Sequence, residues 1–162
     1  MSLEITGFRP GALGRIIELH GRYYAEAWDF DARFEAEVAR EMGEFLARFD
    51  PARDGIWLAV EGADIVGSIV IDGAAAEQQG ARIRWFIIDP ACHGRGVGRR
   101  LLDEAMAFCR KQPWHRVYLD TFAGLDAARR LYEDQGFQLI DERFDRDWNV
   151  AGVTHQTFEC FI

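Results

Sequence analysis

The sequence lacks long apolar runs, and its start has no basic segment followed by an apolar stretch. Its apolar runs are far shorter than the roughly 18 residues that a membrane helix requires. Cysteine is scarce as well: Cys92, Cys109 and Cys160 are widely spaced and form no C-x-x-C pair. Such a pattern is typical of a reducing compartment rather than of a disulfide framework. We therefore expect a soluble, cytoplasmic protein without membrane association.

Linkers, repeats and low-complexity segments are also missing. The four prolines are scattered over 162 residues, and no serine- or glycine-rich stretch or charge run divides the chain. A chain of this length can bury the core of one domain but is short for two. Residues 1–162 are therefore predicted to form one domain.

Positive charge is in deficit, with 19 lysines and arginines against 27 aspartates and glutamates and a net charge of −8. This field repels nucleic acid and anionic membranes, so neither is expected as a partner. A phosphate-bearing ligand would need its own local group of hydrogen-bond donors. The four histidines and three cysteines show no metal-ligand spacing, and no metal site is predicted.

The apolar periodicity predicts the element order βααβββαβαββ. This is an α/β (α+β) domain with a mixed central sheet of about seven strands and four helices on its faces. The uninterrupted apolar residues 85–88 indicate a central strand with both faces covered. The expected strands are 2–8, 56–62, 64–71, 81–88, 116–122, 137–144 and 153–161, and the expected helices begin after Pro10-Gly11 and at 31–49, 96–110 and 126–135, the last closed by a left-handed Gly136.

A glycine-rich turn connects strand 81–88 to the following helix. Glycines at alternate positions remove Cβ atoms and permit unusual backbone angles. The free amides and the dipole of the helix N-terminus can then bind a diphosphate. A P-loop would need Gly-Lys-Ser/Thr, which is absent, and the Rossmann pattern would need glycine where Arg99 stands. A turn without a ligand and a Rossmann-type site stay open as alternatives. The turn reads His93-Gly94-Arg95-Gly96-Val97-Gly98 and is followed by Arg99 and Arg100.

Two segments resemble a known family. Residues 83–102, with Ile88-Asp89-Pro90 before His93-x-x-Gly96-x-Gly98, resemble the acetyl-CoA-binding motif of the GCN5-related N-acetyltransferase (GNAT) family. Residues 128–137 are similar to the A-x-x-L-Y-x-x-x-G-F segment of that family, and the strand order is similar over the whole chain. Residues 20–28 also resemble acetyltransferase domains that are fused to MarR-type regulators.

The chain departs from the family pattern at two positions. His93 stands where the motif usually begins with Gln or Arg, and Leu125 stands where Asn often precedes the second motif. The first change matters little if backbone amides bind the ligand. The second removes a side-chain contact, so affinity for the coenzyme is expected to differ.

The resemblance implies a GNAT-like domain that moves an acetyl group from acetyl-CoA, a co-substrate, to a primary amine of a small molecule, peptide or protein. It implies direct attack through a tetrahedral intermediate. Tyr132 is implied as the general acid that protonates the thiolate. The backbone amide of Ile88 is implied to stabilise the oxyanion. The pantetheine is implied to pair with a splayed strand. The implied cofactor-binding residues are Phe86, Ile87, Ile88, His93, Gly94, Arg95, Gly96, Val97, Gly98 and Arg99.

The base that deprotonates the amine is left open among Glu26, Asp29, Glu61 and ordered water, with Glu26 as the named candidate. Aromatic residues around Tyr24 lie beside Glu26 and suit a cationic small molecule or peptide, although such a stripe is also typical of ordinary core. The alternative function is a non-catalytic acyl-CoA-binding sensor or interaction domain. The apolar C-terminal strand, with Phe158, Phe161 and Ile162, suggests pairing across a homodimer.

Overall fold

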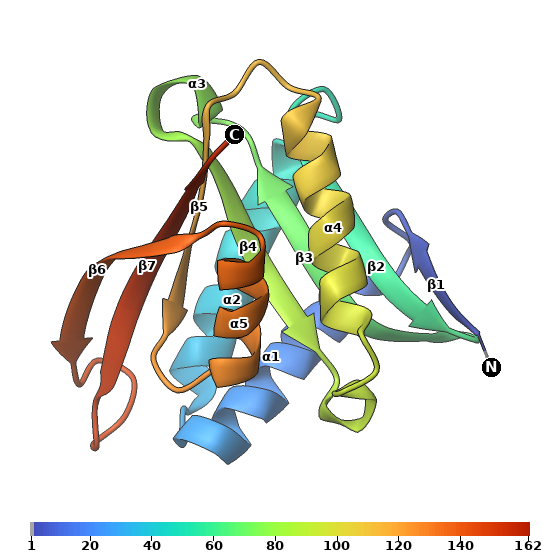
Figure 1. Cartoon of the computed structure of the whole chain (residues 1–162). Helices are drawn as coiled ribbons and strands as arrows, with labels where there is room; N and C mark the ends of the chain where they lie inside the picture. The colour runs from blue at the N-terminus through green and yellow to red at the C-terminus, as the bar shows by residue number, and fades with distance from the viewer. Residues whose placement is uncertain (1) are drawn as a thin grey trace.

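The computed structural model describes residues 2–162, which build a seven-stranded sheet with helices on both of its faces (Figure 1). The strand order is β1-β2-β3-β4-β5-β7-β6. Neighbouring strands are antiparallel except for β4 and β5, which are parallel. The strands are β1 (Leu3–Thr6), β2 (Gly55–Glu61), β3 (Asp64–Asp72), β4 (Ala81–Ile88), β5 (Arg116–Phe122), β6 (Gln138–Asp145) and β7 (Val153–Phe161).

The helices divide between the two faces of the sheet. Figure 1 shows α1 and α2 behind the sheet and α4 and α5 in front of it. The predicted fold is confirmed, and the structure adds a short helix, α3, that spans a single turn and is too short to show a helical period in sequence. The helices are α1 (Ala12–Trp28), α2 (Ala32–Ala47), α3 (Ala76–Gln79), α4 (Val97–Arg110) and α5 (Asp126–Asp134), with a 3-10 turn at Pro90–Cys92.

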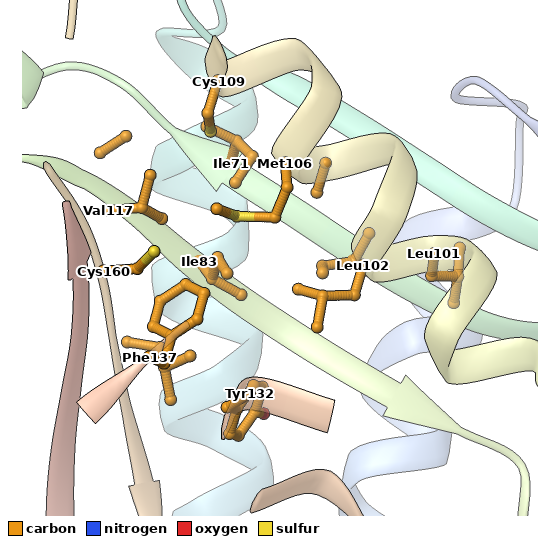
Figure 2. Packing of buried hydrophobic residues seen from close by; sticks show 14 of the residues in the cluster. Ile71, Ile83, Leu101, Leu102, Met106, Cys109, Val117, Tyr132, Phe137 and Cys160 are labelled. Carbon is orange, nitrogen blue, oxygen red and sulfur yellow. The ribbon is translucent and has the colours of Figure 1, made fainter. Parts of the chain in front are cut away.

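Apolar side chains at helical spacing explain why each helix packs where it does. In α4 the buried residues Leu101, Leu102, Ala105, Met106 and Cys109 share one face, which is the amphipathic pattern of a helix on a sheet. Figure 2 shows this face of α4 packed against strand residues of the front core cluster. A second cluster lies under α1 and α2 and includes their buried apolar side chains. The two clusters hold the sheet from both sides.

Strand β4 lies in the middle of the sheet, as its apolar sequence predicts. It ends at Ile88, and the side chain of the next residue, Asp89, accepts a hydrogen bond from the Ala91 amide at 3.0 Å. After the end of α5, Gly136 has a φ of 97°, so the predicted left-handed cap is confirmed. The next amide, of Phe137, donates to the Tyr132 carbonyl at 2.9 Å. These hydrogen bonds fix the turns that follow β4 and α5.

Most of the C-terminal strand is not available for the expected dimer contact, because β7 lies between β5 and β6. From His155 to Glu159 both of its edges are paired, whereas Cys160 and Phe161 pair with β5 alone. The free edges of the sheet belong to β1 and β6. The apolar C-terminus in the sequence reflects interior position, although Phe161 itself is exposed.

Two further properties concern the described chain as a whole. The three cysteines are buried and free. Over residues 2–162 no helix combines the length and apolarity needed to cross a membrane.

Candidate active site

Strands β4 and β5 begin side by side and then separate. Their parallel pairing joins Ala81 to Val117 and ends where Ile83 meets Leu119, and no later pair joins them in the described chain. The second half of β4 therefore has β3 on one edge and an open edge on the other. Open backbone groups in the middle of a sheet must be satisfied by some other partner.

A β-bulge lies at the point of separation. Ser68 pairs with Ile87 and Val70 with Arg84, so two residues of β4 face one residue of β3. Trp85, one of the two, has a φ of 46°, which is a strained angle for a bulky residue. Its carbonyl accepts a hydrogen bond from Ser68 Oγ at 2.7 Å. Trp85 packs in the cluster under α1 and α2, whereas Ile83 packs in the front cluster, so the bulge changes the face to which β4 side chains point.

The backbone of Ile88 faces the open edge. The Asp89 amide donates to the Val66 carbonyl of β3 at 2.8 Å. Because successive residues of a strand point their polar groups to opposite edges, those of Ile87 also face β3, while those of Ile88 and Phe86 face away from it. The Ile88 carbonyl accepts a hydrogen bond from His93 Nε2 at 3.0 Å. The Ile88 amide is thus aimed at the gap between β4 and β5.

The glycine turn forms one wall of a cleft at this gap. Gly94 and Gly96 have φ values of 78° and 76°, and Gly96 immediately precedes α4. In the described chain, a Cβ built on either glycine would meet no atom within 4 Å, so both border open space. The cleft has a volume of about 540 Å³. Its lining includes Phe86, Ile87, Ile88, His93, Gly94, Gly96, Val97, Gly98 and Arg99, together with Leu125, Leu131 and Tyr132.

The arginines of the turn are bonded to neighbouring groups. Arg95 does not line the cleft, because its guanidinium pairs with Glu61. Arg99 lines the cleft and pairs with Asp134 at 2.7 Å. Arg100 donates to a backbone carbonyl of β1. The turn therefore presents its amides and the helix dipole to the cleft, with less free positive charge than the sequence indicates.

Tyr132 is buried in the wall of the cleft on α5. It is 5 % exposed, and its ring lies about 6 Å from the rings of Phe86, Phe137 and Phe158. Figure 2 shows Tyr132 and Phe137 in the front core cluster. Burial raises the pKa of the Tyr132 hydroxyl above its ordinary value, because the charged phenolate is poorly solvated there. The phenol therefore keeps its proton at neutral pH.

A second cavity approaches Tyr132 from the face covered by α1 and α2. It has a volume of about 620 Å³ and is bounded by these helices, by β4 and β5 and by the β6–β7 end of the sheet. Four residues line both the cleft and this cavity: Tyr24, Phe86, Thr121 and Tyr132. We call these four residues the junction. Two substrates that enter from opposite faces could meet there.

The second cavity is aromatic at one end and acidic along its walls. The Tyr24 ring lies 4.9 Å from that of Phe34 and 5.7 Å from that of Phe122, and Trp148 continues the cluster. Burial, and to a lesser extent the neighbouring Tyr132, raises the pKa of Tyr24. The charged lining residues are the carboxylates Glu37, Glu41, Asp120, Asp141 and Asp147 and the guanidiniums Arg82, Arg84 and Arg143.

Those guanidiniums have carboxylate partners. Arg84 pairs with Glu41, Arg82 lies 3.4 Å from Asp120, and Arg143 pairs with Asp145 outside the lining. Asp141 and Asp147 have no ion-pair partner within the described chain. The cavity therefore carries an excess of negative charge.

The proposed bases occupy other places. Glu26 and Asp29 are exposed and line neither the cleft nor the second cavity. Glu61 is bonded to Arg95, which lowers the pKa of the Glu61 carboxylate. These positions argue against the expectation that Glu26 takes a proton from a substrate at the junction. No group of three or more His, Cys, Asp or Glu side chains in residues 2–162 could hold a metal ion.

Sequence reasoning missed His20, which is 6 % exposed and lines the second cavity. The signal was present, because His20 falls on the apolar face of α1, one turn after Ile16. A polar residue on a core-facing stripe requires a partner or a ligand. The bulge at Trp85 left no comparable signal.

The sequence model of the acetyltransferase (GNAT) family matches residues 14–137. The chain therefore belongs to the acetyltransferase (GNAT) family. It is 43 % identical over 70 residues to N-alpha-acetyltransferase RimI of Mycobacterium tuberculosis, covering 43 % of this chain and 42 % of that protein. It is 25 % identical over 144 residues to N-acetylaspartate synthetase of Danio rerio, covering 88 % and 50 %. The chain thus spans about half the length of the curated relatives it matches.

Solved structures share the fold over nearly the whole chain. The ribosomal-protein-S18-alanine N-acetyltransferase of Escherichia coli superposes with a TM-score of 0.72 at 18 % identity, covering 99 % of this chain and 94 % of that one. The structure of yncA from Salmonella typhimurium, solved with its cofactor acetyl-CoA, has a TM-score of 0.77 at 15 % identity and the same coverage. At such identities the likeness concerns the fold alone.

Proposed function

We propose that this protein is an N-acetyltransferase that moves the acetyl group of acetyl-CoA to a primary amine. The observation that carries the proposal is the junction, where the cleft beside the glycine turn and the second cavity share Tyr24, Phe86, Thr121 and Tyr132. A transferase needs its donor and its acceptor to reach one point from separate sites. A module that only sensed acyl-CoA would not need the second cavity.

The cleft suits the donor. The amides of the turn and of the first turn of α4 would hold the diphosphate, with Gly94 and Gly96 leaving room for its oxygens. The pantetheine arm would lie along the open edge of β4, which Phe86 and the amide of Ile88 face, while the Ile88 carbonyl is bonded to His93. The backbone amide of Ile88 would then donate to the thioester oxygen as negative charge develops on it.

The residues of the junction account for the chemistry. The amine nitrogen forms a bond to the acetyl carbon, and the electron pair of the broken C–S bond goes to sulfur. Tyr132 gives its hydroxyl proton to that sulfur and recovers a proton from the acylated nitrogen. Because burial raises the pKa of the Tyr132 hydroxyl, the phenol is protonated at neutral pH and has a proton to donate as the C–S bond breaks.

The second cavity suits an amine with a further positive charge. Its unpaired Asp141 and Asp147 would attract an ammonium or guanidinium group, and its aromatic end offers ring faces to a cation. The names of the relatives RimI and N-acetylaspartate synthetase both describe transfer to nitrogen. We therefore propose a cationic small molecule or a basic peptide as the acceptor.

The test has two stages. Acetyl-CoA at 100 times its dissociation constant should stabilise the protein by about 2.7 kcal/mol, visible as a raised melting temperature. Release of free thiol should then be followed with matched amines: a monoamine, a diamine of equal length and an amino acid with an acidic side chain. We expect turnover to be fastest with the diamine. Stabilisation without amine-dependent thiol release would favour the sensor function, and no stabilisation at millimolar acetyl-CoA would exclude both.

A further inference from the structure

His20 is a buried polar residue whose two ring nitrogens have different surroundings. Nδ1 lies 2.8 Å from the carbonyl oxygen of Ile16. A carbonyl can only accept a hydrogen bond, so Nδ1 carries the proton and Nε2 of the neutral ring carries a lone pair. Within residues 2–162, Nε2 has no hydrogen-bond partner and is not one of the polar atoms sealed off from solvent. Nε2 is thus an unused acceptor on a residue that lines the second cavity.

The position of this acceptor relates it to the junction. His20 lines the second cavity, and its ring is stacked on that of Tyr24, with 6.3 Å between centroids and 15° between planes. Tyr24 belongs to the junction. His20 is therefore one ring away from the point where the cleft and the second cavity meet. A donor group on a ligand in the second cavity could therefore form a hydrogen bond with Nε2.

We propose that His20 Nε2 accepts a hydrogen bond from the acceptor amine and so positions the amine for attack. The inference rests on the proposed function. A neutral primary amine has two N–H groups and one lone pair. With one N–H bonded to Nε2, the lone pair can point at the acetyl carbon. The proton that the nitrogen loses on acylation returns to Tyr132, so His20 stays neutral throughout and acts by orientation.

A role as proton acceptor from an ammonium is much less favourable for His20. Burial lowers the pKa of the imidazole to about 4, whereas an alkylammonium such as that of lysine has a pKa of about 10.4. Proton transfer between them would be uphill by a factor of about a million. The amine must therefore arrive at His20 already neutral.

Two substitutions separate positioning from packing. In His20→Asn the side-chain NH2 can keep the hydrogen bond to the Ile16 carbonyl, but nothing replaces Nε2. In His20→Gln the amide oxygen can reach the place of Nε2, but the bond to Ile16 is given up. We expect His20→Asn to lower kcat/KM for the amine about tenfold, the effect of one hydrogen bond, with KM for acetyl-CoA unchanged. His20→Gln should retain most of the activity despite a lower melting temperature.

The opposite pattern would overturn the proposal: a folded His20→Asn protein with kcat/KM within about twofold of wild type, or activity in both variants that follows their melting temperatures. A measurement on the wild type needs neither variant. The 15N shift of His20 Nε2 should move when a substrate amine is added to the complex with free CoA, and an unchanged shift would count against the contact. If the wild type bound acetyl-CoA but acetylated no amine, the proposed function would fail first and His20's role with it. If turnover were the same in His20→Asn as in the wild type, only the proposed role of His20 would be refuted.

Discussion

The buried, neutral state of His20 predicts a loss of stability in mild acid. Its pKa is about 4 in the folded protein, against an ordinary value of 6.5. As the pH falls below 6.5, His20 binds a proton in the unfolded chain but not in the folded protein, so the free energy of unfolding decreases. The lowered folded pKa means that the stabilisation is present above pH 6.5 and is lost as the pH falls towards 4.

The size of the effect follows from the two pKa values. Between pH 7.5 and pH 5 the contribution of His20 should fall by about 2 kcal/mol, and the full loss below pH 4 is about 3.4 kcal/mol. For a small domain, 2 kcal/mol is a large share of the total stability. The shift should therefore be easy to measure.

Urea denaturation of wild type and His20→Asn at pH 7.5, 6 and 5 provides the assay. Other titrating groups contribute equally to both proteins, so the difference in their unfolding free energies isolates His20. That difference should move in favour of the variant by about 2 kcal/mol on going to pH 5. A difference that stays constant over this range would refute the reasoning, because it would mean that His20 binds a proton as readily in the folded protein as in the unfolded chain.

Three further predictions concern the cleft and the sheet. Tyr132→Phe should lower kcat by about 10²–10⁴-fold in a thiol-release assay and leave stability nearly unchanged. The control Tyr118→Phe, also a change of tyrosine to phenylalanine but on β5, should leave kcat unchanged. Equal rates for the two variants would rule out the acid role of Tyr132. Gly96→Ala should destabilise the protein by about 1–2 kcal/mol because of the positive φ of Gly96. It should also weaken acetyl-CoA binding at least tenfold, as measured by calorimetry. The control Gly14→Ala, at a position where a Cβ meets no described atom within 4 Å, should bind acetyl-CoA as the wild type does. Arg84→Met should reduce the free energy of unfolding by about 3 kcal/mol, because the Arg84 side chain is 11 % exposed and lies between two carboxylates. Urea denaturation measures the loss, and a value below about 0.5 kcal/mol would contradict the prediction.

The sequence was sufficient for the fold and for much of the cleft. Apolar periodicity predicted the strands and the four longer helices, because each helix or strand buries one face and the burial pattern repeats along the chain. The glycine spacing at 94–98 predicted the turn, since positive φ angles there are a local backbone requirement. Gly136 was readable for the same reason.

The second cavity could not be read from the sequence. Its lining comes from α1, α2, β4, β5 and the β6–β7 end of the sheet, segments that lie up to 137 residues apart between His20 and Thr157. The ion pairs are equally non-local: Arg95 bonds to Glu61 instead of lining the cleft. The partner of each arginine is decided by side chains that are distant from it in the sequence.

The sequence by itself determined the fold, the turn beside α4 and the place of Tyr132 on α5, because each of these depends on neighbours within a few residues. Only the tertiary structure decided that β4 separates from β5 at a bulge, that Glu26 lies outside both sites and that His20 offers an unused nitrogen beside the junction. These features arise from packing between elements distant in the chain. Side-chain pairing across a folded interior has no periodicity along the sequence from which it could be predicted.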